Sequence, residues 1–524
     1  MKQHYPKTLL LLFLCLFINT KELVASGAYA DILIDGIYYR FSGDDEVNVG
    51  SPYWGGYESS SYTHYSGTVK IPAFVTYNNT RYHVTGIDNG AFGGCGSLTT
   101  VIIPSSVTKI GSNAFDYCIS LTSVTIPGSV TSIGSTAFAH CTSLESVSFP
   151  ESVKSIESGM FDYCSGLKHF TIPDGTTSIG NSAFRECTNL TFISIPNHVT
   201  TIGSDAFSNC TGLTSVNIGS SVTTIDVMAF SGCSNLESIN IPEKVSQIGY
   251  GAFQHCSSLK AIIIPGSVTK IDQKAFSGCS SLSSVTINSG ATGIQSSAFE
   301  NCPDITSLNI DCGYIANWFE NKQKLQKLII GNNVETIGWH AFYNCFSLHD
   351  VNIPKNVTNI EDYAFSGCSS LTSITIPARV TSIGKYSFFG CQGIASITLP
   401  EGLKEIGDNG FYGCQNLKEI YCYAVEPPAV GYNVFYNVNA NEVMLVVPDE
   451  AVEAYRSHPV WGLFLIETVT GINAPQRSDA GETVKCTWYD LGGRRISNEK
   501  VSSMRGIFIK KQNSTDANTK KDLR

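Results

Sequence analysis

The chain has 524 residues, of which 15% are charged and 42% are hydrophobic. The charged fraction lies well below the roughly 25% of ordinary soluble domains, and 47 glycines and 19 prolines are too few for a collagen-like or low-complexity chain. The 34 basic and 44 acidic residues give a formal net charge of −10, which argues against nucleic acid as a partner.

The first 30 residues are organised like an export signal. Lys2 and Lys7 precede an apolar run from Leu9 to Ile18 that is too short to span a bilayer as a mature helix, and Ala28-Tyr29-Ala30 provides a cleavage site. We therefore predict a signal peptide over residues 1–30 and a secreted or cell-surface protein, outer-membrane association included. No other segment reaches 18 consecutive apolar residues, so no membrane span is expected.

Residues 31–83 are predicted to form an N-terminal β cap. Ile32-Leu33-Ile34 and Ile37-Tyr38-Tyr39 are strand-like. Val69-Lys70-Ile71-Pro72 is a further short strand signal that ends at proline, and a hairpin is expected at Tyr77-Asn78-Asn79. An element of this kind would close the open end of a repeat array against water.

Fourteen cysteines reveal that repeat array. Ten of them, from Cys95 to Cys302, are 23 residues apart, and four more follow at the same interval from Cys345 to Cys414. The gap between the two groups corresponds to one repeat that lacks three residues, with Lys322 at the cysteine position. A phenylalanine stands three residues before each of these positions. We therefore predict about 15 coils over residues 84–422.

One unit, read from Val107 to Pro127, is Val-x-x-Ile-Gly-x-x-Ala-Phe-x-x-Cys-x-x-Leu-x-x-Val-x-Ile-Pro. Its Val-x-Ile stretch alternates apolar and polar residues and ends at proline, which indicates a short strand. Gly-Ser-x-Ala-Phe suggests a single helical or 3₁₀ turn with an inward phenylalanine. Neither piece can bury its apolar side alone. The unit predicts a β-rich solenoid with a parallel sheet on one face and short helical or 3₁₀ turns, capped at both ends.

The spacing Leu-x-x-Val-x-Ile-Pro, followed by Ile-Gly-x-x-Ala-Phe-x-x-Cys, resembles the BspA-like class of leucine-rich repeat. This resemblance covers about Val84 to Tyr421, roughly two thirds of the chain. It implies a horseshoe-like or flatter solenoid with parallel strands on one face. It also implies a cell-surface protein that adheres to host matrix or plasma proteins or to other cells.

The shortened repeat is irregular between Asp311 and Lys324. Trp318 stands there at the position that alanine holds in other repeats. An exposed tryptophan would be a typical interface hot spot. We expect instead that this ring fills the space left by the missing residues.

Residues 423–470 are predicted to be the C-terminal cap. They contain Pro427-Pro428 and Val446-Val447-Pro448, followed by Tyr455, Trp461 and Phe464. This order resembles the terminal element of the same repeat family.

Residues 471–524 are predicted to form a small β-hairpin unit with a basic polar tail. The segment from Trp488 to Arg495, followed by Gly506-Ile507-Phe508-Ile509, is similar to the C-terminal β domain that directs type IX secretion. That family places one more apolar strand where this chain continues as the polar segment from Gln512 to Arg524. A sorting domain and a plain structural hairpin both remain open.

The repeat cysteines invite a disulfide interpretation in an exported protein. Stacked coils would place their Cβ atoms near the ~4.8 Å coil spacing, beyond the ~3.8 Å usual for a disulfide. We therefore predict a column of buried thiols that act as small hydrophobic side chains. No histidine accompanies the cysteines at ligand spacing, and no H-E-x-x-H, G-x-S-x-G or P-loop motif occurs, so no metal, no cofactor and no enzymatic activity are expected.

Side chains that alternate outward from the predicted strands form two columns of small polar groups. His169 and Phe192 interrupt one column in neighbouring coils, and Thr171 and Ser194 lie beside them in the other. These four residues are the first binding candidates. The plain alternative is that serine and threonine are simply compatible with an exposed strand.

A second candidate patch, on another face, consists of Tyr117, His140 and Tyr163, each of which directly precedes a repeat cysteine. Together these features predict a non-enzymatic solenoid that binds an extracellular protein, by family resemblance an adhesin for host matrix or cell-surface proteins. One alternative is a structural surface protein without a host ligand. Another is a glycan-binding accessory protein, which would need aromatic residues spaced as stacking platforms on one face, whereas the sequence shows only scattered aromatics.

Overall fold

A computed structural model describes residues 23–25, 30–51, 65–468, 486–489, 495–496 and 509–512. The chain divides into two compact units, Met1–Thr468 and Val469–Arg524. In the second unit, β37 (Cys486–Tyr489) pairs antiparallel with β38 (Arg495–Ile496) and with β39 (Ile509–Gln512). The apolar run of the predicted signal peptide and most of the sequence that resembles a sorting domain lie outside the described residues.

The N-terminal part of the first unit is a small mixed sheet that joins the repeat array. Its strands are β1 (Leu23–Ala25), β2 (Ala30–Ile34), β3 (Ile37–Phe41), β4 (Glu46–Val49), β6 (Phe74–Tyr77) and β7 (Thr80–Ile87). β2, β3 and β4 pair antiparallel in order, β4 pairs parallel with β7, and β7 pairs parallel with the first short strand of the repeats. The predicted strands are confirmed. β6 and β7 form the predicted hairpin, with Asn78 and Asn79 at φ 50° and 64° in its turn.

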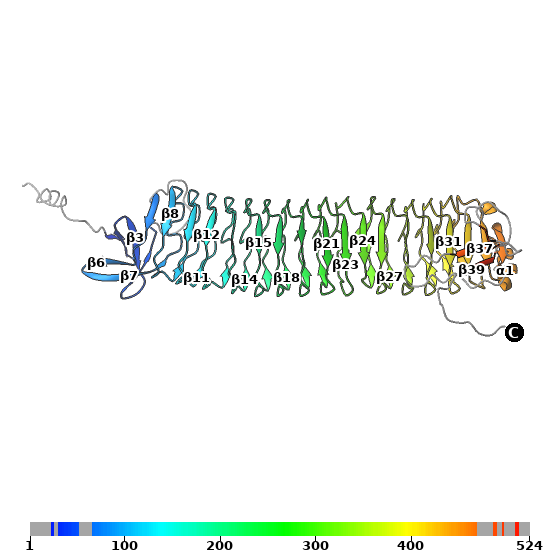
Figure 1. Ribbon diagram of the computed structural model, residues 1–524, viewed down its shortest axis with the longest axis horizontal. Helices are drawn as coiled ribbons and strands as arrows, with labels where there is room; N and C mark the ends of the chain where they lie inside the picture. The colour runs from blue at the N-terminus through cyan, green and yellow to red at the C-terminus, as the bar shows by residue number, and fades with distance from the viewer. Residues whose placement is uncertain are drawn as a thin grey trace, which may run out of the picture. The chain divides into compact units, whose positions relative to one another are not determined.

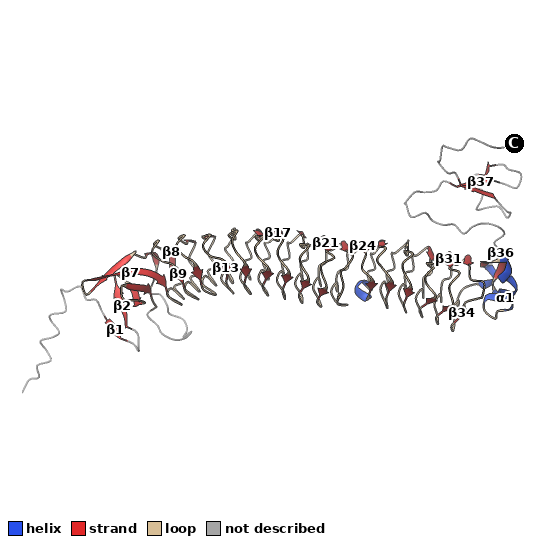
Figure 2. Ribbon diagram, turned by 90° about the horizontal axis from the view of Figure 1, so that it is seen from below, coloured by secondary structure: helices blue, strands red, loops and turns tan. Residues whose placement is uncertain are grey.

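The repeats form a parallel β-solenoid of about 17 turns with two columns of strands (Figures 1 and 2). The first column consists of β5 (Gly67–Lys70), β8 (Leu98–Ile102), β10 (Ser123–Thr125), β12 (Ser146–Ser148), β15 (Phe192–Ser194), β17 (Ser215–Asn217), β19 (Ser238–Ile239), β21 (Ala261–Ile264), β23 (Ser284–Ile287), β24 (Ser307–Ile310), β26 (Lys327–Ile330), β29 (Ser373–Thr375), β31 (Ser396–Leu399), β33 (Glu419–Cys422), β35 (Met444–Val447) and β36 (Leu465–Thr468). The second consists of β9 (Lys109–Ile110), β11 (Ser132–Ile133), β13 (Ser155–Ile156), β14 (Ser178–Ile179), β16 (Thr201–Ile202), β18 (Thr224–Ile225), β20 (Gln247–Ile248), β22 (Lys270–Ile271), β25 (Tyr314–Ile315), β27 (Thr336–Ile337), β28 (Asn359–Ile360), β30 (Ser382–Ile383), β32 (Glu405–Ile406) and β34 (Ala429–Val430).

The first column is the one that the Val-x-Ile pattern predicts, and its strands pair in the register of the repeat. Ser123 pairs with Ser146, and across the short coil Ser307 pairs with Lys327. The second column was not predicted, because its two-residue strands are too short to stand out in the sequence. Parallel pairing also continues past residue 422 through β35 and β36, which takes the array beyond the fifteen coils expected.

Hydrogen-bonded turns connect the second column to the first, where the sequence suggested a helical turn. The difference arises because most coils place two residues, four positions apart, in the left-handed conformation, such as Asn113 at φ 56° and Tyr117 at φ 58°. Left-handed residues at this interval interrupt an α-helix. Backbone N–H groups of the turn donate to the next coil instead, as Phe115 does to the carbonyl of Ala137 at 2.7 Å.

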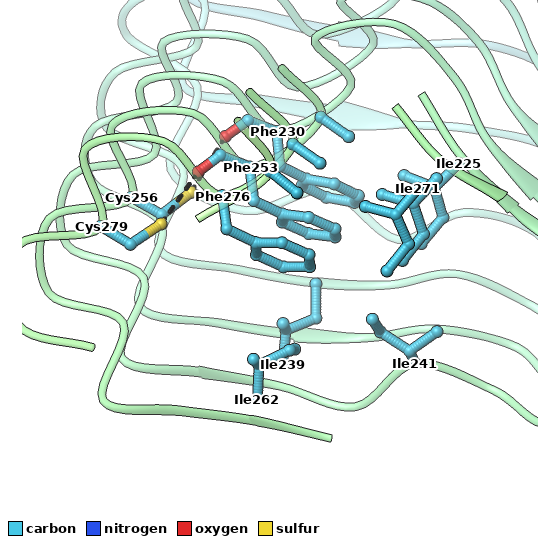
Figure 3. Close-up of a cluster of buried hydrophobic side chains, with 14 of the residues drawn as sticks. Ile225, Phe230, Ile239, Ile241, Phe253, Cys256, Ile262, Ile271, Phe276 and Cys279 are labelled. Carbon is cyan, nitrogen blue, oxygen red and sulfur yellow. Dashed lines mark hydrogen bonds between the residues drawn. The ribbon is translucent and has the colours of Figure 1, made fainter. Parts of the chain in front are cut away.

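The core of the solenoid is a stack of phenylalanine rings beside a column of thiols (Figure 3). The rings of Phe230, Phe253 and Phe276 are nearly parallel, with centroids 5.5 and 5.2 Å apart. From Cys118 onward, each repeat thiol donates to the carbonyl of a phenylalanine in the preceding coil, and the Sγ of Cys256 lies 3.2 Å from the oxygen of Phe230. Burial raises the pKa of Cys256 to about 12. All fourteen repeat cysteines are buried and free, so the predicted column of thiols is confirmed.

The short coil is filled as the sequence suggested. Trp318 lies in η1 (Asn317–Phe319) and is buried, and its Nε1 donates to the carbonyl of Ile294 at 2.8 Å. Lys322 takes the cysteine position, and its Nζ donates to the carbonyl of Phe299 at 3.0 Å. The lysine therefore makes the type of hydrogen bond that the thiols make in the other coils.

Short helices close the C-terminal end of the first unit (Figure 2). They are η2 (Ala440–Glu442), η3 (Asp449–Ala451), α1 (Val452–Ser457) and η4 (Trp461–Leu463). The hydroxyl of buried Tyr455 donates to the carbonyl of Ala424 at 2.9 Å, and the Nε1 of Trp461 donates to Pro428 at 2.9 Å. In the described part of the chain, every helix is too short or too polar to cross a membrane.

Candidate functional site

The strand face carries the four candidates from the outward columns. His169, Phe192, Thr171 and Ser194 are all exposed, because their neighbours along the coil point into the core. Phe192 is 50% exposed, and its strand, β15, pairs parallel with β17 in the next coil. Among the described strands, no backbone β-pairing joins His169 to Phe192. The two residues therefore share a face on adjacent coils without a continuous sheet between them.

Tyr117, His140 and Tyr163, here called the N-terminal aromatic ladder, lie together on the turn edge. The ring of His140 lies between the two tyrosines, with centroids 4.0 Å from Tyr117 and 5.1 Å from Tyr163 and planes within 11° of parallel. All three residues adopt left-handed backbone conformations, with φ between 56° and 58°. The sequence patch is thus one stacked surface.

Two buried carboxylates orient this ladder. Asp116 lies 3.0 Å from the Nδ1 of His140. Asp162 accepts hydrogen bonds from the Nε and the terminal nitrogen of Arg185, at 2.9 and 2.7 Å. The hydrogen bond to Asp162 raises the pKa of Arg185, whose guanidinium lies 5.1 Å from the ring centre of Tyr163. The guanidinium of Arg185 therefore makes a cation–π contact with Tyr163, the last ring of the ladder.

A second set of stacked rings, absent from the sequence-based candidates, lies on the turn edge of the last coils. We call it the C-terminal aromatic array. The ring of Trp339 stacks on that of His340 with their centroids 3.6 Å apart, and the ring of His340 stacks on that of Tyr343 with their centroids 4.5 Å apart. Further contacts of 4.6 to 5.0 Å link Tyr363 to Tyr386, Phe389 to Tyr412, and Tyr412 to Tyr436. The expectation of scattered aromatics is therefore wrong for this edge.

The sequence did contain a signal for the array. His340, Tyr363 and Tyr386 each stand five residues before a repeat cysteine, and Tyr343 and Phe389 stand two residues before one. The position directly before the cysteine, which forms the N-terminal aromatic ladder, carries asparagine or glycine in these coils. The rings come from different repeat positions, and their contact depends on the reach of the side chains.

A groove of about 760 Å³ lies over β28, β30, β32 and β34, the last strands of the second column. Trp339 lines it together with acidic residues and one lysine. The acidic residues are Glu361, Asp362, Glu405 and Asp408, and the lysine is Lys385. Across the described residues, no three His, Cys, Asp or Glu side chains are grouped as a metal site.

The fold and these surfaces define a class of protein, a leucine-rich-repeat solenoid with exposed strand and turn surfaces. The chain belongs to the BspA-type leucine-rich repeat family. The sequence model of that family, described as a BspA type leucine-rich repeat region of six copies, matches residues 85–214, 200–317 and 313–442. The resemblance predicted for the repeats is confirmed.

Solved structures of bacterial repeat proteins are similar to this chain. A leucine-rich repeat protein from Bacteroides ovatus is 29% identical, with a TM-score of 0.53 over 83% of this chain and 99% of that one. A leucine-rich cell surface protein from Faecalibacterium prausnitzii is 27% identical, with a TM-score of 0.31 over 77% and 95%. The pneumococcal vaccine antigen PcpA is 16% identical, with a TM-score of 0.31 over 85% and 99%. No curated protein matches the chain.

Proposed function

We propose that the protein is a secreted or cell-surface, non-enzymatic adhesin that binds an extracellular matrix or cell-surface protein through its N-terminal aromatic ladder. Proteins of the BspA family commonly mediate protein binding at the cell surface. The observation that carries the proposal is the stacked ladder of Tyr117, His140 and Tyr163, each in a left-handed conformation.

The backbone of the ladder supports a binding role over a purely structural one. A left-handed conformation costs a residue with a β-carbon roughly 1–2 kcal/mol, and glycine or asparagine adopts it most readily. Most other coils place glycine or asparagine at the equivalent position, among them Gly94, Asn209 and Asn344, while Glu186 and His255 occupy it in two further coils. Strained residues that persist point to a function for their side chains.

The exposure and rigidity of the ladder suit a protein partner. Tyr117 is 50% exposed and Tyr163 is 40% exposed, and tyrosine is frequent among the residues that dominate interface energies. The buried carboxylates Asp116 and Asp162 hold His140 and Arg185 in place. A preordered surface of this kind loses less conformational entropy when it binds.

The test is binding of the full chain to immobilised matrix proteins. We expect the double substitution Tyr117→Asn, Tyr163→Asn to weaken binding at least tenfold, which corresponds to about 1.4 kcal/mol. Asparagine removes the rings and relieves the backbone strain, so thermal stability should be equal or higher. A loss of binding could then not be attributed to unfolding.

The matched control is His169→Ser, Phe192→Ser, which gives these positions the serine of neighbouring coils in the same column. Binding should persist in this variant. If only the control loses binding, the strand face is the site and the aromatic ladder is not. If the wild-type chain binds no matrix protein, a structural role at the cell surface is favoured instead.

A further inference from the structure

We propose that the groove beside the C-terminal aromatic array binds a neutral oligosaccharide, with Trp339 as the platform for a sugar ring. This site is separate from the N-terminal aromatic ladder and does not depend on the function proposed for it.

The C-terminal aromatic array is a surface of stacked, partly exposed rings and is not part of the hydrophobic core. Its rings lie on the turn edge and stack mainly on one another, over consecutive coils. Trp339 is 48% exposed and Tyr436 is 53% exposed. His340, Tyr363 and Tyr386 adopt left-handed conformations, with φ between 55° and 58°, so this edge also bears backbone strain.

Trp339 has the geometry of a stacking platform. One face of its indole is covered by His340 at 3.6 Å, with the planes 12° apart. Its backbone N–H donates to the Oε2 of Glu361 at 2.8 Å, which fixes the start of the turn. Trp339 is among the residues that line the groove. The C–H face of a sugar ring packs well on such an exposed ring, because the aromatic face is the negative pole of its quadrupole.

The groove also provides hydrogen-bond acceptors for the hydroxyl groups of a sugar. Hydroxyl groups donate hydrogen bonds, and the carboxylates of the groove accept them. The backbone N–H of Lys385 donates to the Oδ1 of Asp362 at 2.6 Å, so this carboxylate is oriented in advance. Within the described residues, the Oδ2 of Asp362 and the Oε1 of Glu361 have no hydrogen-bond partner. These two oxygens are the acceptors that we assign to hydroxyl groups.

Size and charge select the class of sugar. A volume of about 760 Å³ is within the range of small-molecule sites and suits a short oligosaccharide. The lining holds four carboxylates and one lysine, whose Nζ already pairs with Asp408 at 2.9 Å. A sulfated or uronic-acid chain would be repelled by this excess of negative charge. The ligand is therefore a neutral glycan.

The experiment is calorimetric titration of the full chain with neutral tetrasaccharides of glucose, mannose, galactose and N-acetylglucosamine. We expect at least one to bind, with an affinity that changes little between low and high salt. Trp339→Ala should weaken that binding at least tenfold, and Glu361→Gln should weaken it measurably. Circular dichroism of both variants should match the wild type, because Trp339 is half exposed.

The ladder variant Tyr117→Asn, Tyr163→Asn serves as control and should bind the sugar like the wild type. The proposal is overturned if none of the tetrasaccharides binds, or if Trp339→Ala binds as tightly as the wild type. It is also overturned if the groove binds only a basic peptide, such as tetralysine, in a salt-dependent manner. The outcome for matrix proteins leaves this result unaffected, because the two tests use different ligands and alter different surfaces: Trp339 and Glu361 are substituted only in the sugar test.

Discussion

Lys322 shows how a single charged residue is accommodated in an apolar column. It is 7% exposed, and its amine makes the carbonyl hydrogen bond that a thiol makes in other coils. Desolvation by burial lowers the pKa of this lysine from its usual 10.5. The charged form is thus less favourable in the folded protein than in the unfolded chain.

The lowered pKa of Lys322 determines how the stability of the protein depends on pH. Below the folded-state pKa of Lys322, both states are protonated, and the full cost of the buried charge lowers the free energy of unfolding. Between that pKa and 10.5 the unfolded chain binds more protons, so this free energy rises with pH. We expect wild type to gain stability relative to Lys322→Met between pH 7 and pH 10, measured by urea unfolding. For Lys324→Met, at an exposed residue, the stability difference from wild type should stay constant over this pH range. If the difference between wild type and Lys322→Met also stays constant, the lowered pKa of Lys322 is contradicted.

At the scale of the element, one coil is stable only through its neighbours. The phenylalanine rings stack between coils, the thiols bond to the preceding coil, and turn N–H groups donate to the following coil. A defect in one coil should therefore weaken the coils on both sides of it.

The substitution Phe253→Ala tests this coupling. We expect it to lower the free energy of unfolding by about 3–5 kcal/mol, as for other buried phenylalanines. Amide exchange should accelerate in the coils of Phe230 and Phe276 as well as in its own. Phe192→Ala removes the same ring from an exposed position and should change stability by less than about 0.5 kcal/mol. Similar losses for the two variants would be inconsistent with the phenylalanine stack as the core.

The elements that could be predicted are those with a fixed position in the repeat. The Val-x-Ile strand, the inward phenylalanine and the buried thiol recur every 23 residues, and the structure confirms each of them. The turns were harder, because a left-handed residue is evident when it is Gly94 and not when it is Tyr117 or Lys274. The array around Trp339 was missed because its contacts combine side chains from different repeat positions.

At the scale of the whole molecule, the repeat makes the length of the solenoid adjustable. Each coil contacts mainly its neighbours, and the two aromatic surfaces lie many coils apart along the chain. Removal of one coil between them should therefore preserve the fold and both surfaces.

Deletion of residues 211–233 removes one full repeat and joins Cys210 to Ser234 in register. We expect a folded protein with an unchanged circular dichroism spectrum per residue, and with matrix-protein and sugar binding as in the wild type. Deletion of residues 212–233, one residue fewer, shifts the inward side chains of the joined coil out of register. It should lower the melting temperature clearly. Equal melting temperatures for the two deletions would show that register contributes little.

The hydrogen bonds between coils also determine how the solenoid would respond to force. These hydrogen bonds link each coil to the next. A pull on the two ends of the solenoid would therefore load the bonds in series, and the coils would detach one after another. Each detached coil would release 23 residues, or about 80 Å of extended chain. A filament of this construction would lengthen in equal steps under load while the remaining coils keep their binding surfaces. In the adhesive function that we propose, the repeat would then absorb mechanical work as well as carry the binding surfaces.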